Sequence, residues 1–318
     1  MLAAHADWSV APGKRWMAVA APAGALWQVR IEPVGTVATL LARLRDQAGG
    51  APVALGLDLP IGLPQAYVRA HLRHLPDFPG FLDQLAQRPE FFQVCATLAE
   101  IGPHRPFYPQ RPQAGMSRRA HAEALGLGQA AAFHRVCDRP TIDRPAAAPL
   151  FWTLGPNQAG KAALSAWQHL LLPARASPCP PAVWPFDGPL RSLLRPGGVA
   201  IAETYPAEAL RQLGLAVPRS KRRQADRAAL APDLRAAMAR LGAAPDPACA
   251  TSIVDGFGTD PAGEDRFDCL LGLLGLLQVL RGERSDRAPD NGWIQRWEGW
   301  ILGQDASSLP FRGVSVHS

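Results

Sequence analysis

The chain has 318 residues, a formal net charge of +6 and 47% hydrophobic residues, enough to bury a large core in one or two domains. No apolar run reaches the roughly 20 residues that a membrane-spanning helix needs, and the N-terminus lacks the basic and apolar regions of a signal peptide. The five cysteines are scattered without a Cys-x-x-Cys pair, which argues against a disulfide framework and a zinc site. We therefore expect a cytoplasmic protein without a membrane partner.

Arginine supplies nearly all of the positive charge, because the chain has only three lysines, Lys14, Lys161 and Lys221. Positive charge is concentrated in residues 104–144 and again in residues 219–227. Clustered charge of this kind is the electrostatic footprint of a polyanion partner, although heavy use of Arg, Ala and Pro is also typical of a GC-rich coding sequence. We predict nucleic acid, either DNA or RNA, as the partner, and the sequence indicates no protein partner.

The first 60 residues predict three strands, a helix and a fourth strand. The three opening strands are expected at 2–9, 15–21 and 25–32. Their short connecting turns favour antiparallel hairpins. Apolar residues at helical spacing predict a helix over 36–47, and the unalternating apolar run 53–58 is typical of a strand buried on both faces.

Residues 61–175 differ in pattern from the chain on either side. They contain short helical segments broken by Pro and Gly, at 64–74, 89–101, 117–125, 128–137 and 159–172. We interpret this region as a mainly helical insertion, or cap, between two strands of the sheet.

The remainder of the chain returns to the sheet. Val183-Trp184-Pro185 is a candidate edge strand, and the apolar run 199–203 is the next buried strand. Helices are then expected at 206–213, 220–241 and 264–281. The pattern predicts a single α/β domain over 1–302, with antiparallel strands followed by parallel strands and flanking helices, and a C-terminal tail at 303–318.

Acidic residues lie at or near the ends of three predicted strands: Asp7 just before the turn that follows the first strand, Asp58 at the end of 53–58 and Glu203 at the end of 199–203. A carboxylate at the end of a buried strand is costly to desolvate unless positive charge meets it. Several of them gathered at strand ends are typical of a site for Mg²⁺ or Mn²⁺. Each also has a simpler interpretation, since Asp7 could be a turn residue, Asp58 a helix N-cap, and Glu203 the partner of a nearby arginine.

Two more acidic residues, Asp265 and Asp268, begin an otherwise apolar helix and lie three apart on one face. Gly272 and Gly275 continue that face, and a glycine inside a helix costs about 1 kcal/mol relative to alanine. We infer that this face packs closely against the sheet. The favourable placement of acids at a helix N-terminus explains Asp265 well and Asp268 poorly.

Several short motifs lie in a recognisable order between about residues 3 and 281. They are Asp58-Leu59-Pro60-Ile61-Gly62-Leu63-Pro64, Cys137-Asp138-Arg139, Trp184-Pro185-Phe186-Asp187, Glu203-Thr204-Tyr205-Pro206, Lys221 to Arg227, and Asp265-Arg266-Phe267-Asp268-Cys269-Leu270. Together they resemble the domain-of-unknown-function 429 family, whose members are described as predicted nucleases of the ribonuclease H-like fold.

This resemblance implies a ribonuclease H-like mixed sheet flanked by helices and an acidic two-metal site. It makes Asp7 the acid of the first strand, Glu203 the acid of a later strand, and Asp268 with Asp265 the acids of the final helix. Asp58 occupies the aspartate–proline strand end of the family. The chain departs from the family pattern at two positions: Trp8 stands beside Asp7 where glycine is common, and Cys269 follows Asp268 where alanine is usual.

The acidic residues predict a divalent-metal-dependent nuclease that hydrolyses phosphodiester bonds. Asp7, Glu203 and Asp268 would hold two Mg²⁺ or Mn²⁺ ions about 3.5–4 Å apart, and Asp58 and Asp265 would complete the catalytic set. Oxygen ligands without His or Cys favour these ions over zinc.

Three basic residues, Lys221, Arg227 and Arg139, are predicted to bind the substrate by neutralising its phosphates. Two alternatives remain open: a nucleic-acid-binding module with little or no catalysis, and a phosphotransferase or ATPase on the same fold. The segment 155–162 resembles a phosphate-binding P-loop, but Ala162 replaces the Ser or Thr that would hold Mg²⁺, which argues against that activity.

Overall fold

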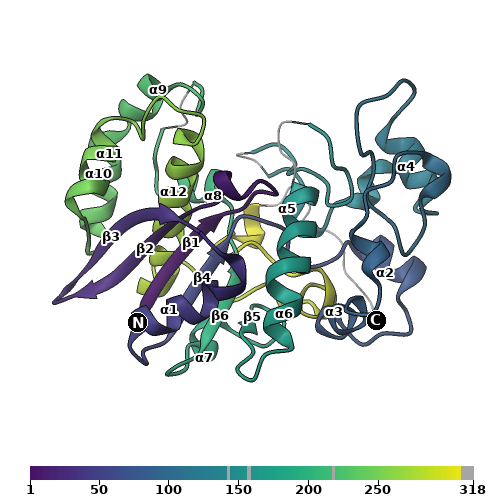
Figure 1. The fold of residues 1–318 in the computed structure, drawn as a ribbon, viewed down its shortest axis with the longest axis horizontal. Helices are drawn as coiled ribbons and strands as arrows, with labels where there is room; N and C mark the ends of the chain where they lie inside the picture. The colour runs from purple at the N-terminus through teal and green to yellow at the C-terminus, as the bar shows by residue number, and fades with distance from the viewer. Residues whose placement is uncertain (142–143, 156–158, 217–218, 309–318) are drawn as a thin grey trace. The chain divides into compact units, whose positions relative to one another are not determined.

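The computed structural model describes residues 1–141, 144–155, 159–216 and 219–308 (Figure 1). The chain divides into two compact units. The first unit consists of residues 1–59, 165–287 and 301–303, and the second of residues 60–164, 288–300 and 304–318. Residues 156–158 of the P-loop-like segment and residues 309–318 of the predicted tail lie outside the described residues. That residues 1–302 form a single domain stays a prediction.

The first unit is built on a seven-stranded mixed sheet with the order β5-β6-β4-β1-β2-β3-β7. The strands are β1 (Leu2–Asp7), β2 (Trp16–Ala23), β3 (Leu26–Pro33), β4 (Val53–Leu57), β5 (Ala182–Val183), β6 (Val199–Glu203) and β7 (Ala243–Pro245). β1, β2 and β3 pair antiparallel, whereas β1–β4, β4–β6, β5–β6 and β3–β7 pair parallel. The expected α/β class, with antiparallel strands followed by parallel ones, is confirmed.

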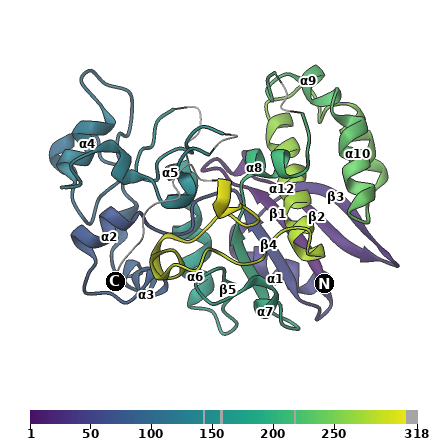
Figure 2. The ribbon, with the colours of Figure 1, turned by 180° about the vertical axis from the view of Figure 1, so that it is seen from behind.

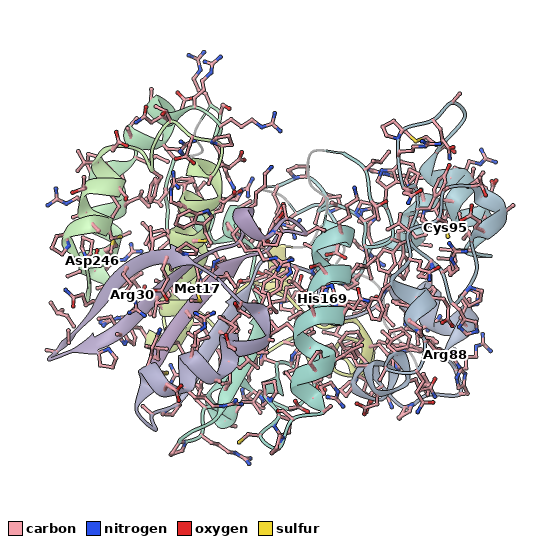
Figure 3. All side chains as sticks on the ribbon, in the orientation of Figure 1. Met17, Arg30, Arg88, Cys95, His169 and Asp246 are labelled. Atoms are coloured by element: carbon pink, nitrogen blue, oxygen red, sulfur yellow. The ribbon has the colours of Figure 1, made fainter. Side chains whose placement is uncertain are left out.

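The central strands are buried on both faces. β4 and β6 are buried along their whole length, and Met17 in β2 is fully buried (Figure 3). This explains why apolar runs without alternation predicted them. The edge strand expected near Val183 is confirmed as β5, whereas β7 was not predicted because Ala-Ala-Pro carries none of the β-branched residues typical of strands.

Helices cover both faces of this sheet (Figures 1 and 2). Those lying wholly in the first unit are α1 (Leu40–Ala48), α6 (Leu172–Arg175), α7 (Leu190–Leu193), α8 (Pro206–Gln212), α9 (Gln224–Ala228), α10 (Ala231–Arg240), α11 (Pro247–Val254) and α12 (Gly263–Arg281). α12 packs on β1, β2 and α8, and α1 packs on β1 and β4. The single helix expected over 220–241 is wrong, because the chain forms α9 and α10 there and Pro232 begins the second of them.

α12 approaches its neighbours through glycine, as the sequence predicted. A Cβ atom at Gly272 would overlap the imidazole ring of His5, a fully buried residue of β1, and one at Gly275 would lie 2.8 Å from the Cβ of Ala209 in α8. The acid-bearing helix therefore lies directly on the central strand of the sheet, and the inference drawn from the glycine stripe is confirmed.

The second unit is mainly helical and irregular. Its helices are α2 (Gln65–His71), α3 (Phe78–Leu85) and α4 (Arg118–Ala124), with the start of α5 (Ala159–Ala166) and a π-helix at Ile294–Glu298. The helices expected at 89–101 and 128–137 are wrong: these stretches contain only 3₁₀ turns, at Pro89–Phe92, Leu98–Glu100, Ala130–Phe133 and Val136–Asp138. Edge-to-face aromatic contacts among Phe81, Phe91, Phe107 and Phe151 form much of its core.

A buried ion pair lies inside the second unit. Arg135 donates from Nε to Asp138 Oδ2 and from Nη2 to Asp138 Oδ1, both at 2.9 Å, and from Nη1 to the Glu298 carbonyl at 3.1 Å. The Glu298 carboxylate accepts the backbone N–H groups of Gln65 and Val136, both at 3.0 Å. Burial alone would raise the pKa of Asp138, but the Arg135 guanidinium lowers it below its ordinary value. Here each buried charge has a partner.

Across the described residues, none of the helices combines the length and the apolar character that crossing a membrane requires.

Candidate functional site

Asp7 and Asp58 are neighbours at the carboxyl ends of adjacent parallel strands. Asp7 is the last residue of β1, and Asp58 directly follows β4. The register pairs Ala6 with Leu57, and the Asp58 N–H donates to the Ala6 carbonyl at 3.1 Å. The strand pairing therefore brings together two carboxylates that are far apart in the sequence, as the sequence predicted for strand ends.

Glu203 ends the next parallel strand at the same edge. β6 pairs with β4 so that Glu203 stands opposite Leu57, one residue before Asp58. Glu203 is only 5% exposed, and its charge is among the causes that raise the pKa of Asp58. Three predicted strand-end acids thus lie on three successive strands, β1, β4 and β6.

α12 contributes the other two acids from its first two turns. Asp265 and Asp268 are half-buried, and the charge of each raises the pKa of Asp7. Asp265 is also the hydrogen-bond partner of the Asp7 side chain. The helix therefore places both carboxylates over the end of β1. We call Asp7, Asp58, Glu203, Asp265 and Asp268 the acidic cluster.

Burial and mutual repulsion dominate the electrostatics of Asp7, Asp58 and Asp265 in the acidic cluster. Burial is the main cause that raises the pKa of Asp58 to about 8 and the pKa of Asp265 to about 6, and the neighbouring Asp268 charge adds to both. Burial and three aspartates also raise the pKa of Asp7 well above its ordinary value. Like charges and loss of water both penalise the ionised form. At neutral pH, the cluster without a bound cation therefore keeps protons on some of its carboxyl groups.

Lys221 is a cation in direct contact with Asp268 of the cluster. Its ammonium donates to Asp268 Oδ1 at 2.6 Å and lowers the pKa of both Asp7 and Asp58. Burial alone would lower the pKa of Lys221, but Asp268 raises it above its ordinary value. The exposed Lys14 lowers the pKa of Asp265 in the same way. Among the described residues, Lys221 and Lys14 are thus the lysines whose charge lowers the pKa of Asp7, Asp58 and Asp265.

The chemistry of the donors fits a hard divalent cation. The cluster offers carboxylate oxygens, and one of them, Asp265 Oδ2, is buried without a hydrogen-bond partner. Among the residues that the structure describes, no three of the five carboxylates each bring an oxygen within 4.8 Å of one another. The cluster is therefore more open than a single protein coordination sphere. Mg²⁺ is commonly held by only one or two carboxylates, with water and substrate phosphates as its other ligands.

The predicted substrate-binding residues have different surroundings. Lys221 lies at the cluster, as described, whereas Arg227 is 1% exposed and donates to the backbone carbonyls of Lys221, Gly256 and Gly258. Arg227 therefore presents no exposed atom to a substrate. Arg139 belongs to the second unit and is exposed, directly after the 3₁₀ turn Val136–Asp138.

Two residues beneath the cluster were not predicted as part of the site. His5 is fully buried with neither ring nitrogen hydrogen-bonded, and burial lowers its pKa to about 3, so the ring is neutral. Cys269 is fully buried, and burial followed by the charge of Asp7 raises its thiol pKa well above the ordinary value. The signal for His5 was present in the sequence, because residues two apart in a strand share a face and His5 precedes Asp7 by two.

The comparisons with known proteins add no relative: the chain matches no family model, no curated protein and no solved structure.

Proposed function

We propose that the protein is a divalent-metal-dependent hydrolase that cleaves phosphodiester bonds in nucleic acid. Asp7, Glu203 and Asp268 would hold Mg²⁺ or Mn²⁺, with Asp58 and Asp265 beside them. Bound there, two such ions would supply a Lewis acid for the phosphate and an acidified water as nucleophile.

The observation that carries this proposal is the charge imbalance of the acidic cluster. Burial and mutual repulsion raise the pKa of Asp7, Asp58 and Asp265, and Lys221 and Lys14 compensate only part of the negative charge. A site that holds protons against repulsion at neutral pH gains free energy when a divalent cation replaces them. A purely structural cluster would be expected to carry matching positive charges, as the Arg135–Asp138 pair does.

The chain's own residues have distinct roles in this proposal. Asp7 and Asp268 approach the site from β1 and α12, so that an ion bound there is held from two sides. Without metal, burial raises the pKa of Asp58 to about 8, so a cation bound beside it would displace its proton and leave a carboxylate able to accept a proton from the attacking water. Lys221, already beside Asp268, would neutralise charge on the phosphate.

We also propose that the fold is of the ribonuclease H-like kind, as the resemblance to the domain-of-unknown-function 429 family implies. Support comes from the antiparallel β1, β2 and β3 and the parallel β4 and β6, with acids at the ends of β1 and β6 and on α12.

The test measures Mn²⁺ binding by calorimetry and cleavage of single-stranded, duplex and junction oligonucleotides, DNA and RNA, in the wild type, Asp7→Asn and Asp268→Asn. Either substitution should lower cleavage by more than about 100-fold, because mutating even an outer-shell partner of a metal costs roughly 10- to 100-fold. Each should also weaken Mn²⁺ binding.

The matched control is Asp233→Asn, which changes an exposed aspartate of α10 in the same unit and should leave binding and cleavage unchanged. Cleavage that persists in both cluster variants would refute the proposal. Steeply salt-dependent binding of oligonucleotides without any Mn²⁺ requirement or cleavage would instead indicate a nucleic-acid-binding module. A rise in melting temperature with ATP would indicate the phosphotransferase alternative.

A further inference from the structure

A buried arginine ties the segment that carries Lys221 to the turn that leads into α12. Arg227 donates from Nε to the Gly256 carbonyl at 2.8 Å, from Nη2 to the Gly258 carbonyl at 2.7 Å, and from Nη1 to the carbonyl of Lys221 itself. Each of its three nitrogens is thus used on a backbone oxygen. One side chain therefore holds two chain segments that are about 30 residues apart.

The turn at residues 256–258 has an unusual backbone conformation in which the carbonyls of Gly256 and Gly258 accept hydrogen bonds from Arg227. Gly256, Phe257 and Gly258 all have positive φ values, of 65°, 66° and 86°, and Phe257 is a bulky residue for which this conformation is rare. A Cβ atom at Gly256 would lie 2.8 Å from the backbone nitrogen of Ala228. At the start of α12, a Cβ at Gly263 would overlap the Arg227 guanidinium. Gly263 therefore makes room for Arg227, and Gly256 makes room for the backbone of the helix that carries it.

We propose that Arg227 is a positioning residue that holds Lys221 against Asp268, a role that rests on the proposed function of the acidic cluster. Lysine has a long flexible side chain, so its ammonium stays beside one carboxylate only when its backbone is fixed. Arg227 fixes that backbone relative to the helix that carries Asp265 and Asp268. Arg227 thus positions Lys221 beside Asp268 without making a hydrogen bond to the acidic cluster itself.

A second contact supports the same connection. Gln224 donates from Nε2 to the carbonyl of Asp255 at 2.6 Å and to its side-chain Oδ1 at 2.7 Å. It joins the segment 221–228 to the residue just before the same turn. Gln224 makes no contact with Lys221 in these bonds, so Arg227 provides the direct hold on the lysine backbone.

The first test uses the small number of lysines in the chain. Acetylation of Lys14, Lys161 and Lys221 by a limiting amine-reactive ester is followed by mass spectrometry. In the wild type, Lys221 should react about tenfold more slowly than the exposed Lys14, because its ammonium is hydrogen-bonded to a carboxylate. Asp268→Asn should abolish that protection and calibrate the assay. Arg227→Gln should abolish it as well, with Lys14 unchanged.

The matched control is Arg266→Gln. Arg266 also donates to a carbonyl of this turn, that of Phe257, at 2.6 and 3.1 Å, but makes no hydrogen bond to Lys221 among the described residues. Its loss should lower the melting temperature without exposing Lys221. If Arg227→Gln fails to fold, Arg227→Lys keeps the charge but not the three-way hold, and it should expose Lys221 to the same degree. Full protection of Lys221 in a folded Arg227 variant would overturn the proposal.

The second test asks whether Arg227 acts through Lys221 on hydrolysis. Arg227→Gln and Lys221→Met should each lower kcat for Mn²⁺-dependent cleavage, and Arg227→Gln should have no further effect in the Lys221→Met background. Independent, additive losses would show that Arg227 acts otherwise and would overturn the proposal. If the wild type neither binds Mn²⁺ nor cleaves, the proposed function fails, and the lysine reactivity still decides whether Arg227 positions Lys221.

Discussion

Two buried acids, Asp138 in the second unit and Asp58 in the first, have pKa values shifted in opposite directions. In the second unit, Asp138 is 2% exposed and accepts two hydrogen bonds from Arg135, which lowers its pKa. In the first unit, Asp58 and Asp7 meet other aspartates, and their pKa values are raised. The number of acids is not what distinguishes the two regions. The two regions differ in whether a positively charged side chain is paired with the buried acid.

This difference separates a structural role from a binding role. A buried ion pair whose hydrogen bonds are made within the protein is stabilised without a ligand. A group of carboxylates that repel one another is destabilising until a cation arrives from outside. The predictions below test this distinction, from the largest expected effect to the smallest.

Removing Arg135 from its ion pair with Asp138 should strongly destabilise the protein. Arg135→Met leaves the Asp138 carboxylate buried and without its partner, which should lower the free energy of unfolding by about 3–5 kcal/mol, as measured by chemical denaturation. The control is Arg139→Met, four residues further on and exposed, which should change stability by less than about 0.5 kcal/mol. Equal effects of the two variants would show that the ion pair contributes nothing special.

Raising the pH should weaken the metal-free first unit. The pKa of Asp58 is about 8 in the folded protein and 3.8 ordinarily, so its contribution to stability is complete below pH 3.8 and is lost as the pH rises towards 8. Between pH 6.5 and 8, the loss should be about 2 kcal/mol, measured by denaturation in a chelator. The buried His5 and His121, whose pKa values are lowered from 6.5 to about 3 and about 4, are neutral when folded but titrate near pH 6.5 when unfolded, so they offset part of this loss at the lower end of the range.

Asp58→Asn should reduce this slope, because asparagine remains neutral at every pH, and Asp7, whose pKa is also raised, would contribute what remains. Asp233→Asn should retain the full slope. The pH dependence that Asp138 contributes has the opposite sign, because its pKa is lowered in the folded protein. Asp138 stabilises the fold at pH values above its ordinary pKa, and that stability is lost as the pH falls through its folded pKa. A metal-free wild type whose stability does not depend on pH between 6.5 and 8 would contradict the assignment of Asp58.

Metal binding should displace protons from the acidic cluster. At pH 7, Asp58, with a pKa of about 8, is mostly protonated without metal, so Mg²⁺ or Mn²⁺ should release about one proton per protein, and more if Asp7 also ionises. Calorimetric titrations in buffers of different protonation enthalpy measure this number. Asp58→Asn should reduce the number of protons released by about one. Metal binding without proton release would show that the ion does not bind at these carboxylates.

Local patterns predicted much of the fold because the central strands and α12 have strong apolar signals. The acids at the ends of β1, β4 and β6 could be identified in the same way, since each follows a run of buried residues. Their assembly with Asp265 and Asp268 was predicted from the glycine face and the family resemblance. Electrostatic interactions through Asp7 and Asp58 link all five carboxylates.

Features that depend on tertiary contacts were beyond the sequence patterns. Arginine is rarely buried, so the position of Arg227 among three carbonyls could not be foreseen from a basic segment that was interpreted as a substrate surface. The 3₁₀ turns Pro89–Phe92 and Ala130–Phe133 of the second unit contain helix-favouring residues, and neither continues into an α-helix. β7 forms only because β3 offers it a free edge.

The contact between Gly272 and His5 has a consequence for the size of ion that the site can accept. Because glycine places only a hydrogen against the imidazole ring, the thickness of that ring sets how far the helix acids stand from the end of β1. Mg²⁺ requires oxygen ligands at about 2.0–2.1 Å, whereas Ca²⁺ accepts about 2.3–2.6 Å. On the proposed function, discrimination between these ions would therefore be governed by two residues that bind neither of them.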